Sequence, residues 1–491
     1  MKTVNGKHFV IPPEVKVVSE TLKKAGFEAY VVGGCTRDLF LERTPKDWDF
    51  TTNATPEQII SLFPETFYEN NYGTVGVVFE TPSDPSLKVV EITPYRLEAK
   101  YSDNRRPDSV TFSNNLEEDL KRRDFTINAI AYDVEKGEAI DLYGGKEDLK
   151  DKIIRTVGDP HDRFNEDALR ILRAIRLQAE LGFTIDATTM TAIAETGKNL
   201  GNIAEERIRD EFTRIIMSDN PMAAIIIIER LKLLQYIIPE LEDGVGVTQN
   251  HSHIYDVWEH SLRALQHAAD KKFSLEVRLA VLFHDIGKPK TRRETGGEVT
   301  FYSHEVTGAQ IAYEILTDLK FPKQICEKVS KLVRWHMFFS DTEQITHSAV
   351  RRIIAKVGKE NIWDLMDVRI CDRIGMGRPK EDPYRLRKYH VMIEEVMRDP
   401  ISVGMLALDG NMLIAEFGMM PGPKIGQVLN ALLEEVLEDP SKNTKEYLGE
   451  RVKELMNLSG EELTKLAEAG KDKKELLEEE EVRKIRRKHK V

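Results

Sequence analysis

Two carboxylates near the start of the chain have the types and the spacing of a metal site. Asp47 and Asp49 are separated only by Trp48, so on an extended strand both carboxylates point to one face while Trp48 and Phe50 turn toward the core. Two adjacent carboxylates repel each other unless cations lie between them. Mg²⁺ prefers carboxylate oxygens together with substrate phosphates, and two such ions can activate an attacking hydroxyl and stabilise the leaving pyrophosphate. The pair therefore predicts Mg²⁺-dependent phosphoryl transfer, although an isolated Asp-x-Asp would be better explained as an acidic turn.

A glycine-rich turn lies directly upstream of these carboxylates. Residues 30–38 read YVVGGCTRD, which predicts an apolar strand, a double-glycine turn and the start of a helix. Gly33 and Gly34 allow the backbone to approach a phosphate, whose charge Arg37 and the helix start can stabilise. Alone, such a turn is more often plain structure, but beside the Asp pair it favours triphosphate binding. Glu91, in an apolar run, would add a third carboxylate from a neighbouring strand, with an edge position as the alternative.

Residues 164–181 predict one helix whose polar residues are spaced by three, which keeps neighbouring side chains within reach of each other. Asp167 can only accept hydrogen bonds and Arg170 can only donate them. Cytosine and adenine both present an amino donor next to a ring-nitrogen acceptor, while guanine and uracil present the reverse. One Asp–Arg pair could therefore accept C and A and reject G and U. Arg173 and Arg176 would neutralise phosphate or hold the pair in place, unless this row is simply the solvated face of an amphipathic helix.

A second group of candidate metal ligands lies in the other half of the chain. His284 and Asp285 are adjacent near a predicted helix end, before a Gly-Lys-Pro break. Neutral imidazoles and carboxylates suit transition metals, so a His-Asp pair with outlying His and Asp can surround one or two divalent ions. The outlying residues of these types are His260, His304, His336 and Asp372.

The elements that must position these residues are of two kinds. The first part of the chain holds β-rich runs between Gly, Pro and Asn clusters, at residues 29–32, 75–79, 87–93 and 126–133. Helical periodicity takes over from about residue 148, as at residues 168–181, 203–217 and 222–234. Breaks at residues 239–246 and 398–400 predict domain joints. We expect an α+β protein with an α/β head at residues 20–147, a mainly helical neck at 148–240, a helical metal-binding domain at 245–400 and a helical tail at 401–491.

Length and composition exclude several classes of protein. A chain of 491 residues exceeds the size of one hydrophobic core, so we expect three or four structural units. With 41% hydrophobic and 31% charged residues and no apolar run near the ~20 residues of a membrane span, the sequence predicts a cytoplasmic protein without membrane contact. Three distant cysteines exclude a disulfide framework. The net charge of −12 means that local basic groups must hold any polyanion.

The head and neck motifs together resemble a known family. GGxxRD at residues 33–38, DxD at 47–49, RRDFTINA at 122–129 and EDxxR at 166–170 are similar, in order and spacing, to class II tRNA nucleotidyltransferases and bacterial poly(A) polymerases. The resemblance implies a polymerase-beta-like head in which Gly34 and Arg37 contact the triphosphate and Arg123 joins the nucleotide site. It further implies that Asp47 and Asp49 bind Mg²⁺ and that Asp167 and Arg170 select the base. The implied partners are tRNA, CTP and ATP.

Two segments distinguish CCA addition from poly(A) synthesis. Residues 95–107 are polar, charged and bounded by prolines, which predicts a mobile loop similar to one found in relatives that add the terminal A. Residues 71–75 read NYGTV, where poly(A) polymerases of the superfamily typically carry a basic Gly-Arg-Arg-Phe-like patch. CCA addition is therefore the predicted function. The alternatives are A-only or poly(A) synthesis, and an HD phosphohydrolase with an RNA-binding head.

The second ligand group resembles the HD phosphohydrolase superfamily. This resemblance implies a transition metal such as Ni, Co or Mn and an accessory phosphohydrolase activity. The implied ligands are His260, His284, Asp285 and Asp372, with His304 and His336 available to a second ion or a phosphate.

A last motif lies in the tail. Residues 421–426 read PGPKIG and open a predicted amphipathic helix. They resemble the tRNA-gripping tail of the same bacterial enzymes, which implies RNA contacts by Gly422, Lys424 and Gly426. A structural turn would explain the same residues.

Overall fold

The computed structural model describes residues 9–68, 73–98, 110–249, 254–296, 298–337, 346–381, 383–397, 402–463 and 466. The chain divides into two compact units, Met1–Ile237 and Ile238–Val491. A mixed sheet with its helices is followed by largely helical regions, as the predicted α+β fold requires. No helix in the described part of the chain is both long enough and apolar enough to cross a membrane.

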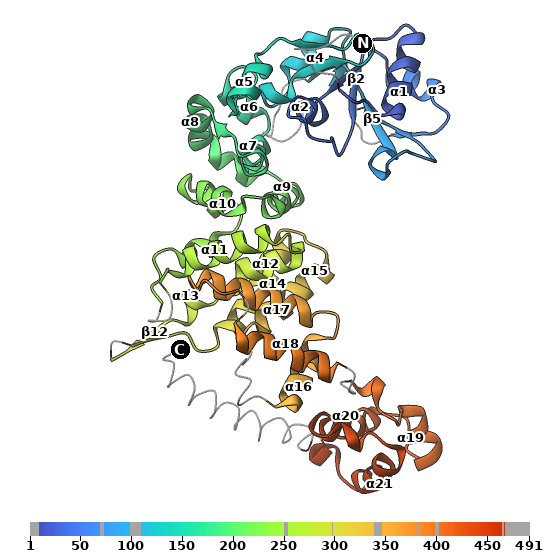
Figure 1. Cartoon of the computed structure of the whole chain (residues 1–491), viewed down its shortest axis with the longest axis vertical. Helices are drawn as coiled ribbons and strands as arrows, with labels where there is room; N and C mark the ends of the chain where they lie inside the picture. The colour runs from blue at the N-terminus through green and yellow to red at the C-terminus, as the bar shows by residue number, and fades with distance from the viewer. Residues whose placement is uncertain are drawn as a thin grey trace. The chain divides into compact units, whose positions relative to one another are not determined.

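The described residues of the first unit form a seven-stranded sheet (Figure 1). In spatial order its strands are β3 (Thr66–Tyr68), β4 (Val75–Val78), β5 (Val89–Pro94), β2 (Asp49–Thr52), β1 (Tyr30–Val32), β8 (Ile130–Asp133) and β9 (Glu138–Asp141). β2 and β5 run parallel, whereas the other neighbouring strands pair antiparallel. The two strands that carry the candidate carboxylates are therefore direct neighbours inside the sheet.

Helices surround this sheet and continue beyond it. They are α1 (Pro13–Lys24), α2 (Gly34–Phe40), α3 (Pro56–Leu62), α4 (Leu116–Lys121), α5 (Gly145–Asp151), α6 (Pro160–Glu166), α7 (Leu169–Leu181), α8 (Ala187–Thr196), α9 (Glu205–Met217) and α10 (Pro221–Arg230). Two short strand pairs lie outside the large sheet: β6 (Arg96–Glu98) with β7 (Val110–Phe112), and β10 (Ile153–Ile154) with β11 (Thr184–Ile185).

The alternation of side chains along the strands separates a packed face from a functional one. Phe50 of β2 is fully buried in one hydrophobic cluster with Leu22 of α1 and Ile59 of α3. Its neighbour Asp49 pairs across the ladder with Val32 of β1, which belongs to a different cluster. Because successive residues of a strand point to opposite faces, Asp49 lies on the face that α1 and α3 do not cover.

Two sequence-based expectations about these elements are wrong. The run at residues 126–133 is not one strand, because Thr126–Asn128 forms a 3₁₀ turn and β8 starts only at Ile130. A hydrogen bond of 2.6 Å from the Thr126 hydroxyl to buried Asp148 fixes that turn against α5. The expected helix at residues 164–181 is also broken into α6 and α7.

The break between α6 and α7 falls on Asp167. Its backbone is extended, with φ −145° and ψ 103°. Its carboxylate accepts a hydrogen bond of 3.1 Å from the Leu169 amide, two residues on. Asp often competes with helix formation by bonding to nearby backbone amides in this way. Asp167 and Arg170 therefore do not share one helix face.

The described residues of the second unit form a helical bundle with one short hairpin (Figure 1). Its elements are α11 (Val257–Asp270), α12 (Leu275–Phe283), α13 (Lys288–Thr291), β12 (Arg293–Thr295), β13 (Glu298–Thr300), α14 (His304–Asp318), α15 (Lys323–Trp335), α16 (His347–Val357), α17 (Ile362–Gly375) and α18 (Tyr384–Val396). α11 packs on α12 and α17, and α15 packs on α12 and α14.

A glycine contact joins the start of α13 to α14. A Cβ atom on Gly287 would overlap the carbonyl oxygen of His304 and lie 2.6 Å from the amide nitrogen of Gly308. The backbone of this segment can approach α14 so closely only because residue 287 has no side chain.

The chain continues into α19 (Gly410–Phe417), α20 (Pro423–Glu438) and α21 (Lys445–Leu455). These helices share a hydrophobic cluster that includes Leu413, Leu432 and Leu448. The buried Arg351 of α16 donates a 2.8 Å hydrogen bond to the Leu437 carbonyl at the end of α20, which ties this cluster to the preceding bundle.

Candidate active sites

The predicted carboxylates of the head converge on one place in the sheet. Asp49 begins β2, Asp47 lies exposed just before it, and Trp48 between them is buried, as the alternation predicts. Asp49 is also in register with Glu91 on the parallel strand β5. Residues in register on adjacent strands place their side chains on the same face. The strand pairing therefore places Glu91 beside Asp49, and Asp47 lies close enough to Asp49 to affect its ionisation.

The electrostatics of this site oppose the ionisation of Asp49 in the absence of cations. Burial raises the pKa of Asp49 to about 6, an effect that Arg123 reduces and Asp47 increases. A divalent cation beside Asp47 and Asp49 would favour the ionised form. The carboxylates thus have the charge and the placement that suit a cation-dependent site.

The double-glycine turn lies against the same carboxylates. Gly33 adopts φ +79°, and a Cβ there would lie 3.3 Å from Asp49 Oδ2 and 3.7 Å from Arg123 Nη1. Gly34 begins α2. A Cβ added to Gly34 would lie 3.5 Å from Arg37 Nη2. The turn thus keeps its backbone close to a carboxylate and two arginines, and the positive φ of Gly33 together with its tight approach to Asp49 disfavours a side chain at that position.

Arg123 is held by an acid that the sequence did not single out. Asp119 is buried, and its Oδ2 accepts hydrogen bonds from Arg123 Nη2 at 3.1 Å and from Thr51 Oγ1 at 3.0 Å. Burial opposes ionisation of Asp119, but Arg123 and Arg122 outweigh it and lower the pKa of this carboxyl. The only sequence signal was an acid one turn before the arginines on α4, a spacing that brings side chains together.

A chain of hydrogen bonds leads from Arg37 to α7. Arg37 Nη1 donates to Asn128 Oδ1 at 3.0 Å, and Asn128 Nδ2 donates to Asp124 Oδ1 at 3.2 Å. Asp124 Oδ2 accepts from Arg173 Nη2 at 2.6 Å. Burial opposes ionisation of Asp124, but Arg173 dominates and lowers its pKa. Arg173 is therefore engaged with the RRD segment, and the nucleotide-binding role predicted for it stays a prediction.

The two residues predicted to read the base, Asp167 and Arg170, are held by two other side chains. Arg207 of α9 bonds both oxygens of Asp167, at 2.7 and 3.2 Å. Arg170 is buried, and its Nη1 donates to Glu166 Oε2 at 2.6 Å. The backbone also links the two residues, since the Arg170 amide donates to the Asp167 carbonyl at 3.1 Å. Sequence reasoning missed Arg207, since its partner lies 40 residues away.

Arg176 lies deeper in the neck. It is buried, with its Nε 2.6 Å from Glu211 Oε2 and its Nη1 2.9 Å from Glu180 Oε2. Two carboxylates thus compensate its charge inside the helical packing. The predicted contact of Arg176 with the nucleotide stays a prediction.

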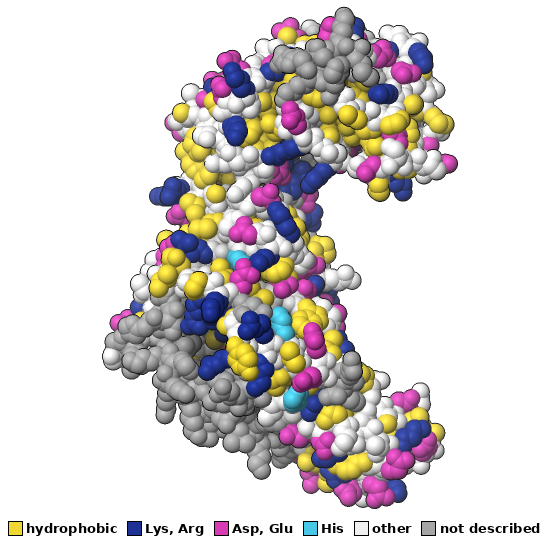
Figure 2. Space-filling view, viewed as in Figure 1, with side chains coloured by type: hydrophobic (Ala, Val, Ile, Leu, Met, Phe, Trp, Pro, Cys, Tyr) yellow, Lys and Arg dark blue, Asp and Glu magenta, His cyan; other side chains and the backbone are white. Residues whose placement is uncertain are grey.

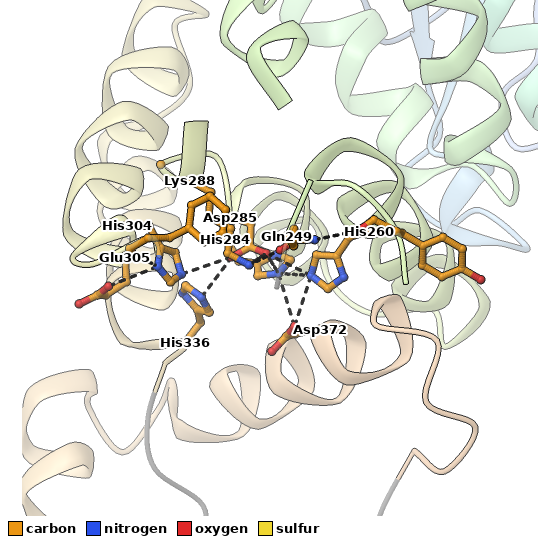
Figure 3. Close-up of polar contacts among 12 residues, drawn as sticks. Gln249, His260, His284, Asp285, Lys288, His304, Glu305, His336 and Asp372 are labelled. Atoms are coloured by element: carbon orange, nitrogen blue, oxygen red, sulfur yellow. Dashed lines mark hydrogen bonds and ion pairs between the residues drawn. The ribbon is translucent and has the colours of Figure 1, made fainter. Parts of the chain in front are cut away.

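The second candidate site gathers all six predicted ligands within the helical bundle (Figure 3). Every one of them is buried. We call this set the HD cluster, and it consists of His260 of α11, His284 and Asp285 after α12, His304 at the start of α14, His336 after α15 and Asp372 of α17.

Asp285 lies at the centre of the HD cluster. Its Oδ2 lies 3.2 Å from His260 Nε2 and 3.3 Å from His284 Nε2, and its Oδ1 lies 3.3 Å from His304 Nε2 and 3.8 Å from His336 Nε2. Among the described residues, two groups could each hold an ion: His260, His284 and Asp285, and Asp285, His304 and His336. The two oxygens of one carboxylate thus face two separate sets of imidazoles.

Asp372 completes the first of these groups. Its Oδ1 lies 3.3 Å from His260 Nε2 and 3.7 Å from His284 Nε2, and Arg369 pairs with its other oxygen. Burial opposes ionisation of Asp372, but Arg369, His260 and His284 together outweigh it and hold its pKa well below the usual range. Asp372 therefore faces the histidines as a carboxylate.

Backbone carbonyls orient three of the histidines. The Nδ1 atoms of His284, His304 and His336 lie 2.7, 2.9 and 2.6 Å from the carbonyl oxygens three residues earlier. Each ring therefore directs Nε2 toward Asp285, as in metal-ligating histidines, whose other nitrogen commonly bonds to a carbonyl or carboxylate. The buried Nε2 atoms of His304 and His336 have no hydrogen-bond partner among the described residues. The geometry and the unpartnered atoms fit metal ligation.

The charges of the HD cluster are coupled to the protonation of its histidines. Burial opposes protonation of His284, but Asp285 and Asp372 outweigh it and raise the pKa of His284 to about 10. Lys288 Nζ lies 2.6 Å from Asp285 Oδ2 and 2.5 Å from Gln249 Oε1. A bound cation would replace the His284 proton, since metal ions and protons compete for such ligands.

The tail motif has an exposed backbone. A Cβ added to Gly422 or Gly426 would meet nothing within 4 Å, so packing does not require glycine at either position. Lys424 bonds to the Met456 carbonyl at 2.8 Å. Their RNA contacts stay predictions. The loop expected at residues 95–107 is wrong for Arg96–Glu98, which form β6 paired with β7, and stays a prediction for the residues from 99 onward, because residues 99–109 lie outside the described part of the chain.

On the face drawn in Figure 2, the Lys and Arg side chains of the described residues lie among Asp and Glu side chains rather than in one continuous basic patch. This agrees with the net charge of −12, which requires any polyanion to be held by local basic groups.

Comparison with known proteins identifies the parts of the chain. Residues 29–155 match the poly A polymerase head domain, residues 182–244 match the probable RNA and SrmB- binding site of polymerase A, and residues 257–377 match the HD domain. These ranges contain the head carboxylates, the helix α9 and the HD cluster respectively.

Similar proteins that match most of the chain or about half of it are named CCA-adding enzymes. The CCA-adding enzyme of Lactobacillus helveticus is 32% identical over 443 residues, which is 89% of this chain and 96% of the relative. The CCA-adding enzyme of Anoxybacillus flavithermus is 46% identical over 225 residues, 46% of this chain and 55% of the relative. The crystal structure of Bacillus stearothermophilus CCA-adding enzyme in complex with CTP covers 90% of this chain and 99% of its own, with a TM-score of 0.66 and 27% identity. The chain therefore belongs to the family of class II CCA-adding enzymes and poly(A) polymerases, with an HD domain.

Proposed function

We infer that this protein adds C, C and A to the 3′ end of tRNA, using CTP and ATP as substrates. The observation that carries this function is the placement of Asp47, Asp49 and Glu91 beside the Gly33 turn and Arg123, within a chain that aligns with CCA-adding enzymes over 89% of its length. The family implies a divalent metal, and we propose Mg²⁺ at these carboxylates because they offer only oxygen ligands.

The residues around the carboxylates divide the work of the reaction. Bound Mg²⁺ would supply activation of the attacking 3′ hydroxyl and stabilisation of the pyrophosphate that leaves. Arg37 and Arg123 hold the triphosphate, to which each offers several guanidinium donors. This leaves Asp49 and Asp47 free to hold cations close to the α-phosphate, where charge develops in the transition state.

Base selection falls to the pair in the neck. Asp167 accepts from the amino group of cytosine or adenine, and Arg170 donates to the neighbouring ring nitrogen. Guanine and uracil would bring an oxygen to Asp167 and an N–H to Arg170, which leaves buried groups without partners. The hold of Glu166 on Arg170 supports this role because it fixes the donor in one orientation.

One assay separates CCA addition from its alternatives. Three tRNA transcripts, ending before CCA, after C and after CC, are each incubated with a single labelled nucleotide. We expect C on the first two transcripts, A on the third, and no further extension. A-only synthesis would give label on the third transcript alone, and poly(A) synthesis would give long A tails on all three.

We further propose that the HD cluster is a phosphohydrolase centre that holds two transition-metal ions. The two ligand groups that share Asp285 support this arrangement, and their imidazole content favours nickel, cobalt or manganese over magnesium. The substrate class is a phosphoester, for which a terminal phosphate or a 2′,3′-cyclic phosphate on damaged tRNA is the natural candidate beside a tRNA-repairing head.

Metal content and hydrolysis test this second activity together. Dialysis of the full chain against Ni²⁺, Co²⁺ or Mn²⁺, followed by elemental analysis, should give two ions per chain in addition to any Mg²⁺ at the head. The same metals should stimulate hydrolysis of a cytidine 2′,3′-cyclic phosphate probe. A protein that binds neither metal nor probe would make the HD domain a structural arm.

A further inference from the structure

The carboxylate of Asp167 is gripped by an arginine from a separate helix. Arg207 of α9 donates from Nη2 to Asp167 Oδ2 at 2.7 Å and from Nη1 to Oδ1 at 3.2 Å. This two-bond geometry is the strong form of an arginine–carboxylate pair. The side chains are 27% and 17% exposed respectively, so the pair lies at the edge of the packing rather than inside it.

The hydrogen bonds from Arg207 leave part of the acceptor capacity of the Asp167 carboxylate unused. An ionised carboxylate has about four acceptor positions, two on each oxygen. Oδ1 accepts from the Leu169 amide at 3.1 Å and from Arg207, and Oδ2 accepts from Arg207 alone among the described residues. Asp167 thus keeps one acceptor position on Oδ2, in an orientation that Arg207 and the Leu169 amide fix from two sides.

We propose that Arg207 is a positioning residue for nucleotide choice. By holding the Asp167 carboxylate in one rotamer, Arg207 presents a single acceptor to the incoming base. A base with an amino group satisfies this acceptor, whereas a base with an oxygen at that place is repelled by it. This inference rests on the base-reading role proposed above for Asp167 and Arg170.

The chemistry of arginine explains why this residue suits the role. A lysine at the same place would offer a point charge without the rigid fork that contacts both oxygens. Without the fork, the Asp167 side chain can rotate away from an unfavourable base, so that rejection weakens. The same rotation removes the fixed acceptor from a favourable base, so incorporation of C becomes less efficient.

The experiment compares C and U incorporation on a tRNA transcript that lacks CCA, measured as the ratio of kcat/KM for CTP and UTP. We expect Arg207→Gln to lower this ratio roughly tenfold or more, mainly through loss of CTP efficiency. Arg207→Lys should fall between Arg207→Gln and the unaltered protein. Arg209→Gln is the matched control, because Arg209 lies on the same helix and donates to the adjacent Asp210.

A double variant separates positioning from a structural role. If Arg207 acts through Asp167, then Asp167→Ala and the double variant Asp167→Ala, Arg207→Gln should show the same C-to-U ratio. Equal loss of CTP and UTP efficiency in Arg207→Gln, with a lowered Tm, would assign Arg207 to the stability of the neck and overturn the proposal. Should Arg207→Gln fail to fold, an unchanged ratio in Arg207→Lys overturns it as well.

The two levels of the hypothesis fail in different ways. An unchanged ratio in Asp167→Ala would remove the base-reading role itself. A lowered ratio in Asp167→Ala with an unchanged ratio in Arg207→Gln would retain base reading and remove Arg207 from it.

Discussion

The head carboxylates and the HD cluster are both sets of candidate metal ligands, but they differ in burial and in the groups that orient them. In the head, Asp47 is exposed and burial raises the pKa of Asp49, so a bound cation would be needed to stabilise the ionised form of Asp49. In the HD cluster all six side chains are buried, and backbone carbonyls already aim three of the rings.

This difference follows from what each site has to admit. The head must accept a nucleotide and a growing RNA end that changes with each addition, so its groups stay accessible. The six side chains of the HD cluster come from, or directly follow, five helices of the bundle, α11, α12, α14, α15 and α17, which enclose them. A buried set of charges is tolerated only when each group is paired or bound to metal, which the HD cluster achieves through Asp285, Lys288 and Arg369.

The largest effect should come from removing a head carboxylate. Asp47→Asn or Asp49→Asn should lower nucleotide addition by ~10³-fold or more, because metal stabilisation of transition-state charge is worth several kcal/mol. Filter binding of tRNA should change little. Asp151→Asn, at an exposed acid of the same head, is the control for loss of one negative charge. Appreciable addition by either site variant would show that the cations are held elsewhere.

A complementary loss should appear in the other region. His284→Ala should abolish transition-metal binding and phosphoester hydrolysis while CCA addition continues at its normal rate. His267→Ala, on α11 with His260 but outside the HD cluster, should retain metal. Elemental analysis and the two activity assays check both variants. If His284→Ala impaired CCA addition as strongly as hydrolysis, the two regions would not be independent.

An intermediate effect tests the segment at residues 100–106, for which the sequence predicts a mobile loop. Deletion of residues 100–106 should leave C addition in place and slow terminal A addition by about 10²-fold, because a small displacement of reacting groups can cost that much. Labelled extension of transcripts ending before CCA and after CC measures the two steps separately. Equal loss of both steps would make this segment a structural part of the head.

The smallest effect concerns stability without metal. Because the folded-state pKa of Asp49 is raised to about 6 from 3.8, its contribution to stability is present below pH 4 and is lost as the pH rises through 6. In EDTA at pH 8, Asp49→Asn should therefore be more stable than the unaltered protein by about 1–3 kcal/mol. Urea unfolding at pH 4 and pH 8 measures this. If Asp49→Asn were less stable than the unaltered protein at pH 8, the ionised Asp49 would not destabilise the head.

Much of both sites was predictable because their signals are local. The alternation of Asp47, Trp48, Asp49 and Phe50 fixed which side chains face the core, and the structure confirms it with Trp48 and Phe50 buried. The ligands of the HD cluster were predicted from residue type and order, and all six meet around Asp285.

What escaped prediction depends on partners distant in sequence. The expected helix at residues 164–181 fails because Asp167 bonds to the Leu169 amide and to Arg207, and no periodicity reports such a contact. The expected strand at residues 126–133 fails because Asp148 captures the Thr126 hydroxyl. Asp119 was missed because an acid on a short helix is usually a solvated residue, and only the fold buries it against Arg123.

Gly287 has a consequence for how the HD cluster constrains the sequence. It has no donor atom for a metal, yet any side chain on it would strike the His304 carbonyl, which belongs to a ligand residue. Asp285 and His304 can lie this close together because the backbone at Gly287 packs directly against the backbone of α14. The candidate metal site therefore constrains a residue that cannot itself bind a metal: any substitution that adds a Cβ at position 287 should push His304 away from Asp285.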